Sequence, residues 1–213
     1  MHSDKELFRK ESLQKLKKDK TKSYLKDFFI RNTILSLIKK LNPKSILLFY
    51  PLDIEPDIKK LIKTLKKNNK KLYLPFMDEV SFKMVEFRPP LIKGRFGIYE
   101  PKDSKKNIKK VDLVLAPIVG IDPLFARIGF GKGMYDRFFQ RLRVRPITLF
   151  TQRELCYSKK IISHDYDVVG DYLITYKTIL KRKGNTYDRV RNNRGSFWDI
   201  GSCRVIFRGQ KSK

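Results

Sequence analysis

The chain has 213 residues, a formal net charge of +27, two cysteines and two histidines. This length allows one well-buried domain and excludes two ordinary domains joined by a linker. The cysteines form no CxxC pair and no Cys/His cluster, which excludes a zinc site of the usual spacing and favours a reducing cytoplasm.

The positive charge is spread along the chain. Its lysines accompany many Ile and Asn residues, as a lysine-rich coding bias would leave them, and no lysine run alternates with aromatic residues. Such a basic surface suits anionic small molecules, and we expect no DNA partner. No apolar run approaches the roughly 20 residues that span a bilayer, and the first residues lack the apolar core of a signal peptide. We therefore expect a soluble protein with no membrane partner.

The first predicted helix begins at a capping box. Ser3 and Glu6 have the required spacing, and the helix should run to about Lys20. Lys5 and Arg9 then lie one turn apart on the same face, where like charges repel mildly unless an anion shares them. A solvated face and an anion site both fit this spacing.

Two further helices are predicted on either side of a strand. The second helix starts near residue 24 and is stopped by Asn42-Pro43, and a buried strand follows over residues 45–52. The predicted apolar stripe of the second helix is Tyr24, Leu25, Phe28, Phe29, Leu35 and Ile38. The third helix should open at Pro56, with Ile58, Leu61, Ile62 and Leu65 on one face.

The remaining elements predict an α/β fold. Strands are expected over residues 71–76, 82–87, 112–117, 146–151 and 172–176, and a helix over residues 134–142. Strands alternating with helices indicate a single three-layer α/β/α domain with a mostly parallel sheet. Ligands of such sheets bind beyond the carboxyl ends of the strands, where Tyr50, Glu55 and a glycine-rich loop should meet.

We assign residues 1–180 to this domain and residues 181–213 to a basic C-terminal tail. The tail holds ten Lys or Arg residues and two acidic residues. We expect it to be flexible, with a strand at residues 203–207 as the alternative.

The most informative segment is Arg127–Arg137, RIGFGKGMYDR, in which three alternate glycines stand among cations, a tyrosine and a carboxylate. Such a loop at a helix start can hold phosphate through backbone N–H groups and the helix dipole. It lacks the Ser/Thr of a Walker A loop and is one residue short of the dinucleotide GxGxxG pattern. Phosphate binding and an ordinary tight loop both fit the spacing, and the flanking charges favour phosphate binding.

This segment resembles the RLGxGxGYYDR signature of 5-formyltetrahydrofolate cyclo-ligases, also called methenyltetrahydrofolate synthetases. Further similar pieces follow in the family's order: Lys5 with Arg9, Tyr50 with Glu55, and residues 71–75, 94–101, 112–117, 152 and 164–165. The resemblance covers roughly residues 3–180. It implies a NagB/RpiA/CoA-transferase-like fold.

The resemblance also implies a reaction. The enzyme would convert 5-formyltetrahydrofolate to 5,10-methenyltetrahydrofolate with ATP as co-substrate and Mg²⁺ as cofactor, releasing ADP and phosphate. The formyl oxygen would take the γ-phosphoryl group, N10 would attack the activated carbon, and phosphate would leave. Positioning and charge neutralisation would supply most of the catalysis. We expect a monomer whose partners are ATP and a reduced folate.

Site residues follow from the same resemblance. Catalysis is expected from Lys132, Arg127 and Tyr135. The expected ATP-binding residues are Lys5, Arg9, Arg127, Gly129, Gly131, Lys132, Gly133, Tyr135 and Asp136. The expected folate-binding residues are Tyr50, Glu55, Phe130, Gly131, Lys132, Gly133 and Met134, and the expected Mg²⁺ ligands are Asp136 and Asp165.

Several of these residues have a structural alternative. Tyr135 can be a core residue, Asp136 can cap its helix, Asp165 can be a surface turn residue, and Glu55 can be the N-terminal acid of a helix. A surface position is the better interpretation of His164 than a catalytic base. Met134 replaces the first aromatic residue of the signature and leaves an apolar wall there.

Two other functions stay open. One is a basic RNA-binding protein that keeps the fold and contacts RNA through residues 181–213. The other is a related ATP-dependent ligase that acts on another substrate.

Overall fold

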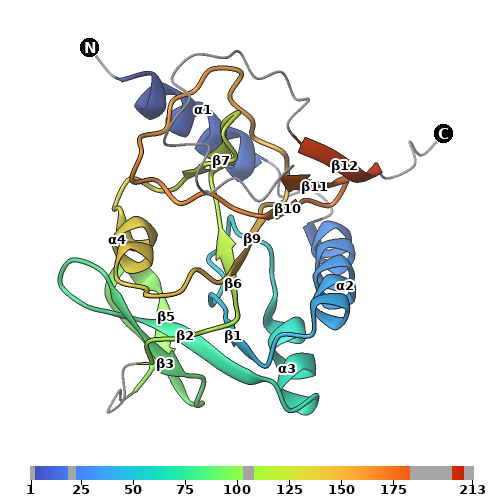
Figure 1. The fold of residues 1–213 in the computed structure, drawn as a ribbon, viewed down its shortest axis with the longest axis vertical. Coiled ribbons are helices and arrows are strands. Elements are labelled where there is room, and N and C mark those ends of the chain that lie inside the picture. The colour runs from blue at the N-terminus through green and yellow to red at the C-terminus, as the bar shows by residue number, and fades with distance from the viewer. Residues whose placement is uncertain (1–2, 19–22, 103–107, 183–202, 209–213) are drawn as a thin grey trace.

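The computed structural model describes residues 3–18, 23–102, 108–182 and 203–208 (Figure 1). The helices are α1 (Asp4–Lys18), α2 (Ser23–Leu41), α3 (Lys59–Lys67) and α4 (Met134–Gln140), with a 3-10 turn η1 (Arg95–Gly97). The main sheet contains β1 (Ser45–Leu47), β2 (Lys71–Met77), β3 (Phe82–Glu86), β6 (Leu113–Pro117), β9 (Ile147–Thr151), β10 (Tyr172–Ile174), β11 (Thr178–Arg182) and β12 (Cys203–Arg208). Two short ribbons pair β4 (Leu91–Lys93) with β5 (Tyr99–Pro101), and β7 (Gly120–Ile121) with β8 (Arg127–Ile128).

The eight strands of the main sheet follow the order β12-β11-β10-β9-β6-β1-β2-β3. The central strands from β10 to β2 run parallel to one another. The outer strands β3, β11 and β12 are antiparallel to their neighbours. The carboxyl ends of the parallel strands therefore meet at one edge of the sheet.

Both faces of the sheet are buried, so the predicted three layers are confirmed. Leu113 and Leu115 of β6 pack with α2 and α3, whereas Val114 and Ala116 pack with α4 on the opposite face. Figure 1 shows α2 and α3 on one side of the sheet and α4 on the other. This alternation is the two-sided burial expected of a central parallel strand. None of the helices within the described ranges is long and apolar enough to cross a membrane.

The predicted capping box is confirmed at the start of α1. The Glu6 backbone N–H donates to Ser3 Oγ at 3.3 Å, and the Ser3 N–H donates to Glu6 Oε2 at 3.2 Å. The predicted start of the third helix at Pro56 is wrong, because α3 begins at Lys59. The chain first makes a turn in which the Glu55 N–H donates to the Leu52 carbonyl at 2.9 Å.

Most predicted strands form within two residues of their expected bounds. The exception is the strand expected over residues 45–52, since β1 ends at Leu47. Beyond it Phe49, Tyr50 and Leu52 line a cavity instead of continuing the strand. The predicted helix over residues 134–142 forms as α4 and ends at Gln140.

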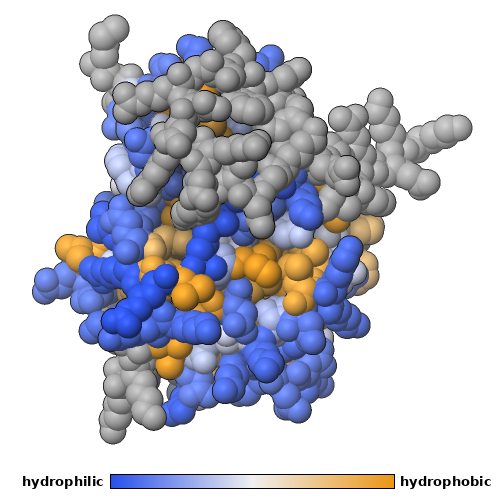
Figure 2. Space-filling view, viewed as in Figure 1, coloured by the Kyte–Doolittle hydropathy of each residue, from blue (hydrophilic) through white to orange (hydrophobic). Residues whose placement is uncertain are grey.

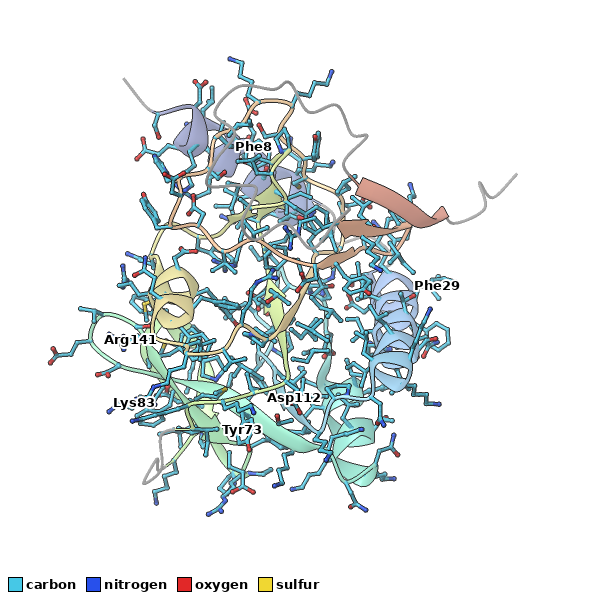
Figure 3. The ribbon with its side chains drawn as sticks, in the orientation of Figure 1. Phe8, Phe29, Tyr73, Lys83, Asp112 and Arg141 are labelled. Atoms are coloured by element: carbon cyan, nitrogen blue, oxygen red, sulfur yellow. The ribbon has the colours of Figure 1, made fainter. Side chains whose placement is uncertain are left out.

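The predicted apolar stripe of the second helix is wrong in its N-terminal half. Tyr24, Leu25, Phe28 and Phe29 are between 44% and 62% exposed. In Figure 3 the Phe29 side chain points away from the body of the protein, and Figure 2 shows hydrophobic residues at the surface near α2. The buried face of α2 contains Asp27, Ile30, Arg31, Ile34 and Ile38.

Polar contacts explain why this face is buried. Asp27 accepts two hydrogen bonds from the Arg153 guanidinium, at 2.8 Å and 3.0 Å. Arg31 Nη1 donates to the Asp57 carbonyl oxygen at 2.9 Å. Buried charged groups need such partners. A prediction from apolar periodicity alone places every Asp and Arg on the solvent side of a helix, so it gave the wrong face here.

The C-terminal region is described in part. The predicted domain boundary after residue 180 falls inside β11, which ends at Arg182. The strand considered for residues 203–207 forms as β12, antiparallel to β11. The flexible tail and its RNA contacts were predicted for residues 181–213. Of these, residues 183–202 and 209–213 lie outside the described residues.

Leu115 tests the central position of β6. This side chain is fully buried, so we expect Leu115→Ala to lower the free energy of unfolding by about 2–5 kcal/mol, through lost burial and a residual cavity. The same substitution at Leu25, which is 51% exposed, should change the free energy of unfolding by less than about 0.5 kcal/mol. Urea denaturation measures both values. Equal losses would contradict the assignment of the exposed face of α2.

Candidate functional site

A cavity of about 350 Å³ opens at the carboxyl ends of the parallel strands. Its polar lining comes from Tyr50, Glu55, Arg127, Lys132 and Tyr135, and its apolar lining includes Phe49, Leu52, Met77, Phe82, Phe96, Phe130 and Met134. In Figure 3 Asp112, which precedes β6, marks the amino ends of the strands, and Phe8 of α1 lies at the opposite end. The expected meeting of Tyr50, Glu55 and the glycine-rich loop is confirmed.

Close packing and backbone conformation account for glycines in this loop. Gly131 and Gly133 have φ values of +93° and +63°, which side chains rarely adopt. A Cβ atom on Gly129 would lie 2.2 Å from Arg127 Nη1. The bare backbone at Gly129 thus leaves room for the arginine beside it.

Arg127 is a buried cation at the cavity wall. Its Nε donates to the Pro117 carbonyl oxygen at 3.1 Å, and its guanidinium lies 4.5 Å from the centre of the Tyr135 ring. Tyr135 also packs edge-to-face on Phe82, with ring centres 5.0 Å apart. Burial raises the pKa of the Tyr135 hydroxyl above its ordinary value. Tyr135 is therefore both a core residue and part of the cavity wall.

Helix α1 brings a second arginine to the loop. Arg9 Nε donates to the Gly129 carbonyl oxygen at 2.8 Å, and its guanidinium passes close to Gly131. The helix is held there because Phe8 packs on Gly120, where a Cβ atom would lie 2.6 Å from the phenyl ring. Arg9, an expected ATP-binding residue, thus contacts the glycine-rich loop.

Lys5 lies one turn before Arg9 and is held by a carboxylate. Its Nζ is 2.5 Å from Asp167 Oδ2 and 3.3 Å from His164 Nδ1. The same Asp167 oxygen accepts a hydrogen bond from the His164 backbone N–H at 2.7 Å. The His164 side chain is 57% exposed and stacks on Tyr166. This agrees with a surface position for the histidine.

Glu55 places a carboxylate in the cavity wall, which it shares with Arg127. One of its oxygens accepts a hydrogen bond from the Leu52 N–H at 2.8 Å. Burial raises its pKa from the ordinary 4.5 to about 7, although that hydrogen bond and the charges of Arg127 and Arg153 act in the opposite direction. The carboxyl therefore titrates near neutral pH. Glu55 lies four residues before α3, so the role of a helix N-terminal acid does not fit.

Aromatic residues surround the mouth of the cavity. Lys132 is exposed, and its Nζ lies 5.7 Å from the centre of the Phe96 ring, which is carried by η1. Tyr50 packs against Tyr99, with ring centres 5.2 Å apart. A planar ligand would thus find aromatic and apolar surface on several sides and charged groups at a few points.

The two predicted metal ligands lie in separate settings. Asp136 Oδ1 accepts a hydrogen bond from the Val168 N–H at 3.3 Å. It makes no cap, since Gly133 is the N-cap of α4 and no side chain caps it. Asp165 is exposed in the segment before Val168. Within the described part of the chain, no three His, Cys, Asp or Glu residues form a group that could hold a metal ion.

Three residues of the site were missed by the sequence analysis. Asp167 pairs with Lys5, Arg153 lies close enough to influence Glu55, and Phe96 reaches the cavity mouth. Phe96 lies inside a family-like segment, so that segment was a usable signal. Asp167 and Arg153 had no signal, because their importance comes from partners more than 100 residues away in the chain.

Comparisons with known proteins identify the chain's relatives. The family model described as "5-formyltetrahydrofolate cyclo-ligase family" matches residues 2–170. A 5-formyltetrahydrofolate cyclo-ligase of Haemophilus influenzae is 33% identical over 114 residues, covering 50% of this chain and 61% of that protein. One from Saccharomyces cerevisiae is 28% identical over 172 residues, covering 65% and 80%. The chain spans about three fifths of the length of the H. influenzae and Escherichia coli relatives.

A solved structure has the same fold. The 5,10-methenyltetrahydrofolate synthetase of Aquifex aeolicus superposes with a TM-score of 0.71 and 25% identity. The match covers 89% of this chain and 99% of that one. The predicted fold is therefore confirmed.

The raised pKa of Glu55 predicts a pH-dependent change in stability. Folding favours the protonated carboxyl, so its stabilisation is complete below about pH 4.5 and is lost as the pH rises through about 7. Glu55→Gln keeps an acceptor for the Leu52 N–H without the charge. At about pH 8 we expect this variant to be more stable by up to about 3 kcal/mol, at about 1.4 kcal/mol per pKa unit.

Urea denaturation at about pH 8 and about pH 4 measures this difference. At the lower pH the two proteins should have the same free energy of unfolding, since both carry a neutral side chain at position 55. If Glu55→Gln and the parent had the same free energy of unfolding at about pH 8, burial would not raise the pKa of the Glu55 carboxyl.

Proposed function

Because the chain belongs to the 5-formyltetrahydrofolate cyclo-ligase family, we propose that it converts 5-formyltetrahydrofolate to 5,10-methenyltetrahydrofolate at the expense of ATP. One observation carries the proposal: a cavity lined by aromatic residues and Glu55 joins a glycine-rich loop flanked by Arg9, Arg127 and Lys132. This joins a site for a planar ring to a site for phosphate. We also propose a cytoplasmic location, which agrees with the free, buried thiol of Cys156.

The phosphate end of the site consists of the loop and its cations. Arg9 and Arg127 are held by carbonyl oxygens, at Gly129 and Pro117, which leaves their positive charge for an anion. Gly131 and Gly133 would let a triphosphate approach the backbone, as at other glycine-rich anion sites, and Gly129 makes room for the Arg127 guanidinium beside it. Lys132 is exposed at the cavity mouth and would neutralise charge on the transferred group.

The folate end of the site is formed by Tyr50, Glu55, Phe130 and Met134, all in the cavity lining. In its ionised form Glu55 would accept hydrogen bonds from the pterin ring, and its second oxygen is available for them. Phe130 and Met134 would contact the ring and the formyl-bearing nitrogen. Tyr135 would fix this wall, with Arg127 over its ring.

The proposed chemistry balances as one phosphoryl transfer and one substitution. The formyl oxygen attacks the γ-phosphorus and ADP leaves, which turns a poor leaving group into a phosphate ester. N10 then attacks the formyl carbon, loses its proton, and expels phosphate to close the ring. The residues described here act by positioning and by charge neutralisation.

We propose Mg²⁺ as the cofactor, with Asp136 and Asp165 as its protein ligands. Asp136 and Asp165 supply hard oxygen donors, and the Asp136–Val168 hydrogen bond ties the start of α4 to the segment that carries Asp165. A Mg²⁺ ion usually takes one or two carboxylates, several waters and substrate phosphates. Once bound, it would neutralise phosphate charge, and these two side chains would orient it.

Lys132 gives the direct test of the activity. Purified protein supplied with Mg-ATP and 5-formyltetrahydrofolate should develop the near-ultraviolet absorbance of the methenyl product. Lys132→Met should lower kcat/KM by about 10²–10³-fold, the usual cost of removing one group that stabilises transition-state charge.

Lys83→Met is the matched control and should keep the parent activity. Lys83 follows Phe82 in β3, so its side chain points to the opposite face of the strand from the cavity. If folded parent protein forms no product, the proposed function fails. ATP hydrolysis that is independent of folate would indicate a ligase with another substrate.

The metal assignment has a separate test. Asp136→Asn and Asp165→Asn should each raise the Mg²⁺ concentration needed for half-maximal activity, because each removes one anionic oxygen ligand. Asp78→Asn, at a partly exposed position paired with Lys83, should leave this concentration unchanged. Parent-like Mg²⁺ dependence in both variants would contradict the assignment.

A further inference from the structure

A buried ion pair lies directly behind the turn that carries Glu55. Asp27 and Arg153 are 4% and 7% exposed. Arg153 Nε and Nη2 donate to the two oxygens of Asp27, at 2.8 Å and 3.0 Å. Two parallel hydrogen bonds of this kind fix the orientation of a guanidinium as well as its place.

The remaining arm of the guanidinium reaches the turn itself. Arg153 Nη1 donates to the Asp53 carbonyl oxygen at 2.7 Å. Glu55 lies two residues after Asp53. The turn is closed by the Leu52 N–H, which donates to the Glu55 carboxylate at 2.8 Å. Hydrogen bonds therefore run from α2 through Arg153 to the backbone of this turn, and the turn itself bonds the cavity carboxylate.

We propose that Asp27 and Arg153 are positioning residues that hold the Glu55 carboxylate in the cavity wall. The role of Glu55 toward folate rests on the proposed function, whereas its placement by the pair does not. Neither residue lines the cavity. The pair acts through the backbone of the turn and through its charge.

The charges around Glu55 give the pair a measurable signature. Arg127 of β8 and Arg153 beyond β9 both favour the ionised carboxyl, and the hydroxyl of Tyr135 in α4 is the further titratable neighbour. Because Asp27 bonds Arg153, its negative charge should weaken the effect of the positive charge of Arg153 on Glu55. Removing Asp27 alone should lower the pKa of Glu55, while removing both partners should raise it.

A neighbouring ion pair provides a matched control. Lys26 Nζ lies 2.8 Å from Glu154 Oε1, so this pair joins the same helix to the same segment one residue away on each side. It bonds neither Asp53 nor Glu55 in the structure. Its loss should affect only the docking of α2.

The experiment compares Asp27→Asn, Arg153→Lys and the double variant Asp27→Asn/Arg153→Gln with Lys26→Met/Glu154→Gln. Arg153→Lys keeps the charge but loses the guanidinium fork. The double variant leaves no lone buried charge and should fold if Asp27→Asn does not. Thermal unfolding shows which variants are folded.

Two readouts are then taken from the folded proteins. Steady-state kinetics should give a ~10-fold to 100-fold lower kcat/KM for 5-formyltetrahydrofolate in Arg153→Lys and the double variant, the usual cost of a misplaced group. Carbon-13 NMR of labelled glutamate, with Glu55→Gln for assignment, gives the titration midpoint of Glu55. It should fall in Asp27→Asn and rise in the double variant, and the control pair should match the parent in both readouts.

The outcomes separate the two proposals. A folded parent without activity overturns the proposed function, and the NMR midpoints then decide the positioning role alone. Folded pair variants with parent kcat/KM and a parent midpoint for Glu55 overturn the positioning role. Equal effects from the Lys26–Glu154 control would also overturn it, because they would reflect the docking of α2 in general.

Discussion

The bidentate contact between Asp27 and Arg153 links three parts of the fold that the chain keeps far apart. It fixes which face of α2 packs on the sheet, it holds the segment that follows β9, and its third hydrogen bond reaches the turn before α3. A buried charge is tolerated only when it is paired and hydrogen-bonded. This requirement turns polar residues of α2 inward and leaves Phe28 and Phe29 in solvent.

The site combines two unusual features at the carboxyl edge of the sheet. Gly131 and Gly133 adopt a left-handed backbone conformation, and Glu55 keeps a carboxyl group in a largely apolar wall. Arginines reduce the cost of that burial without cancelling it. The protein therefore gives up some stability near neutral pH at the position where a ligand with ring nitrogens would supply the missing hydrogen bonds.

Sequence patterns were reliable where local rules decide the structure. The capping box of Ser3 and Glu6, the buried β6 strand and the glycine-rich loop before α4 all follow from spacing and composition. The carboxyl edge of the predicted sheet placed Tyr50 and Glu55 near that loop, and the cavity agrees. The resemblance made Arg9 an ATP-binding residue, and Arg9 contacts the loop. The same methods gave the wrong face for the first half of α2, because a hydrophobicity pattern cannot predict that Asp27 is buried by pairing with a distant arginine.

The sequence by itself determined the family, the three-layer fold and the chemical types at the site, since each depends on neighbours along the chain or on recognisable motifs. Only the tertiary structure decided that Asp167 holds Lys5, that Arg153 supports the Glu55 turn, and that the Glu55 carboxyl titrates near neutral pH. These properties arise from burial and from pairings between distant segments. Both depend on the three-dimensional arrangement of the strands, which local patterns do not specify.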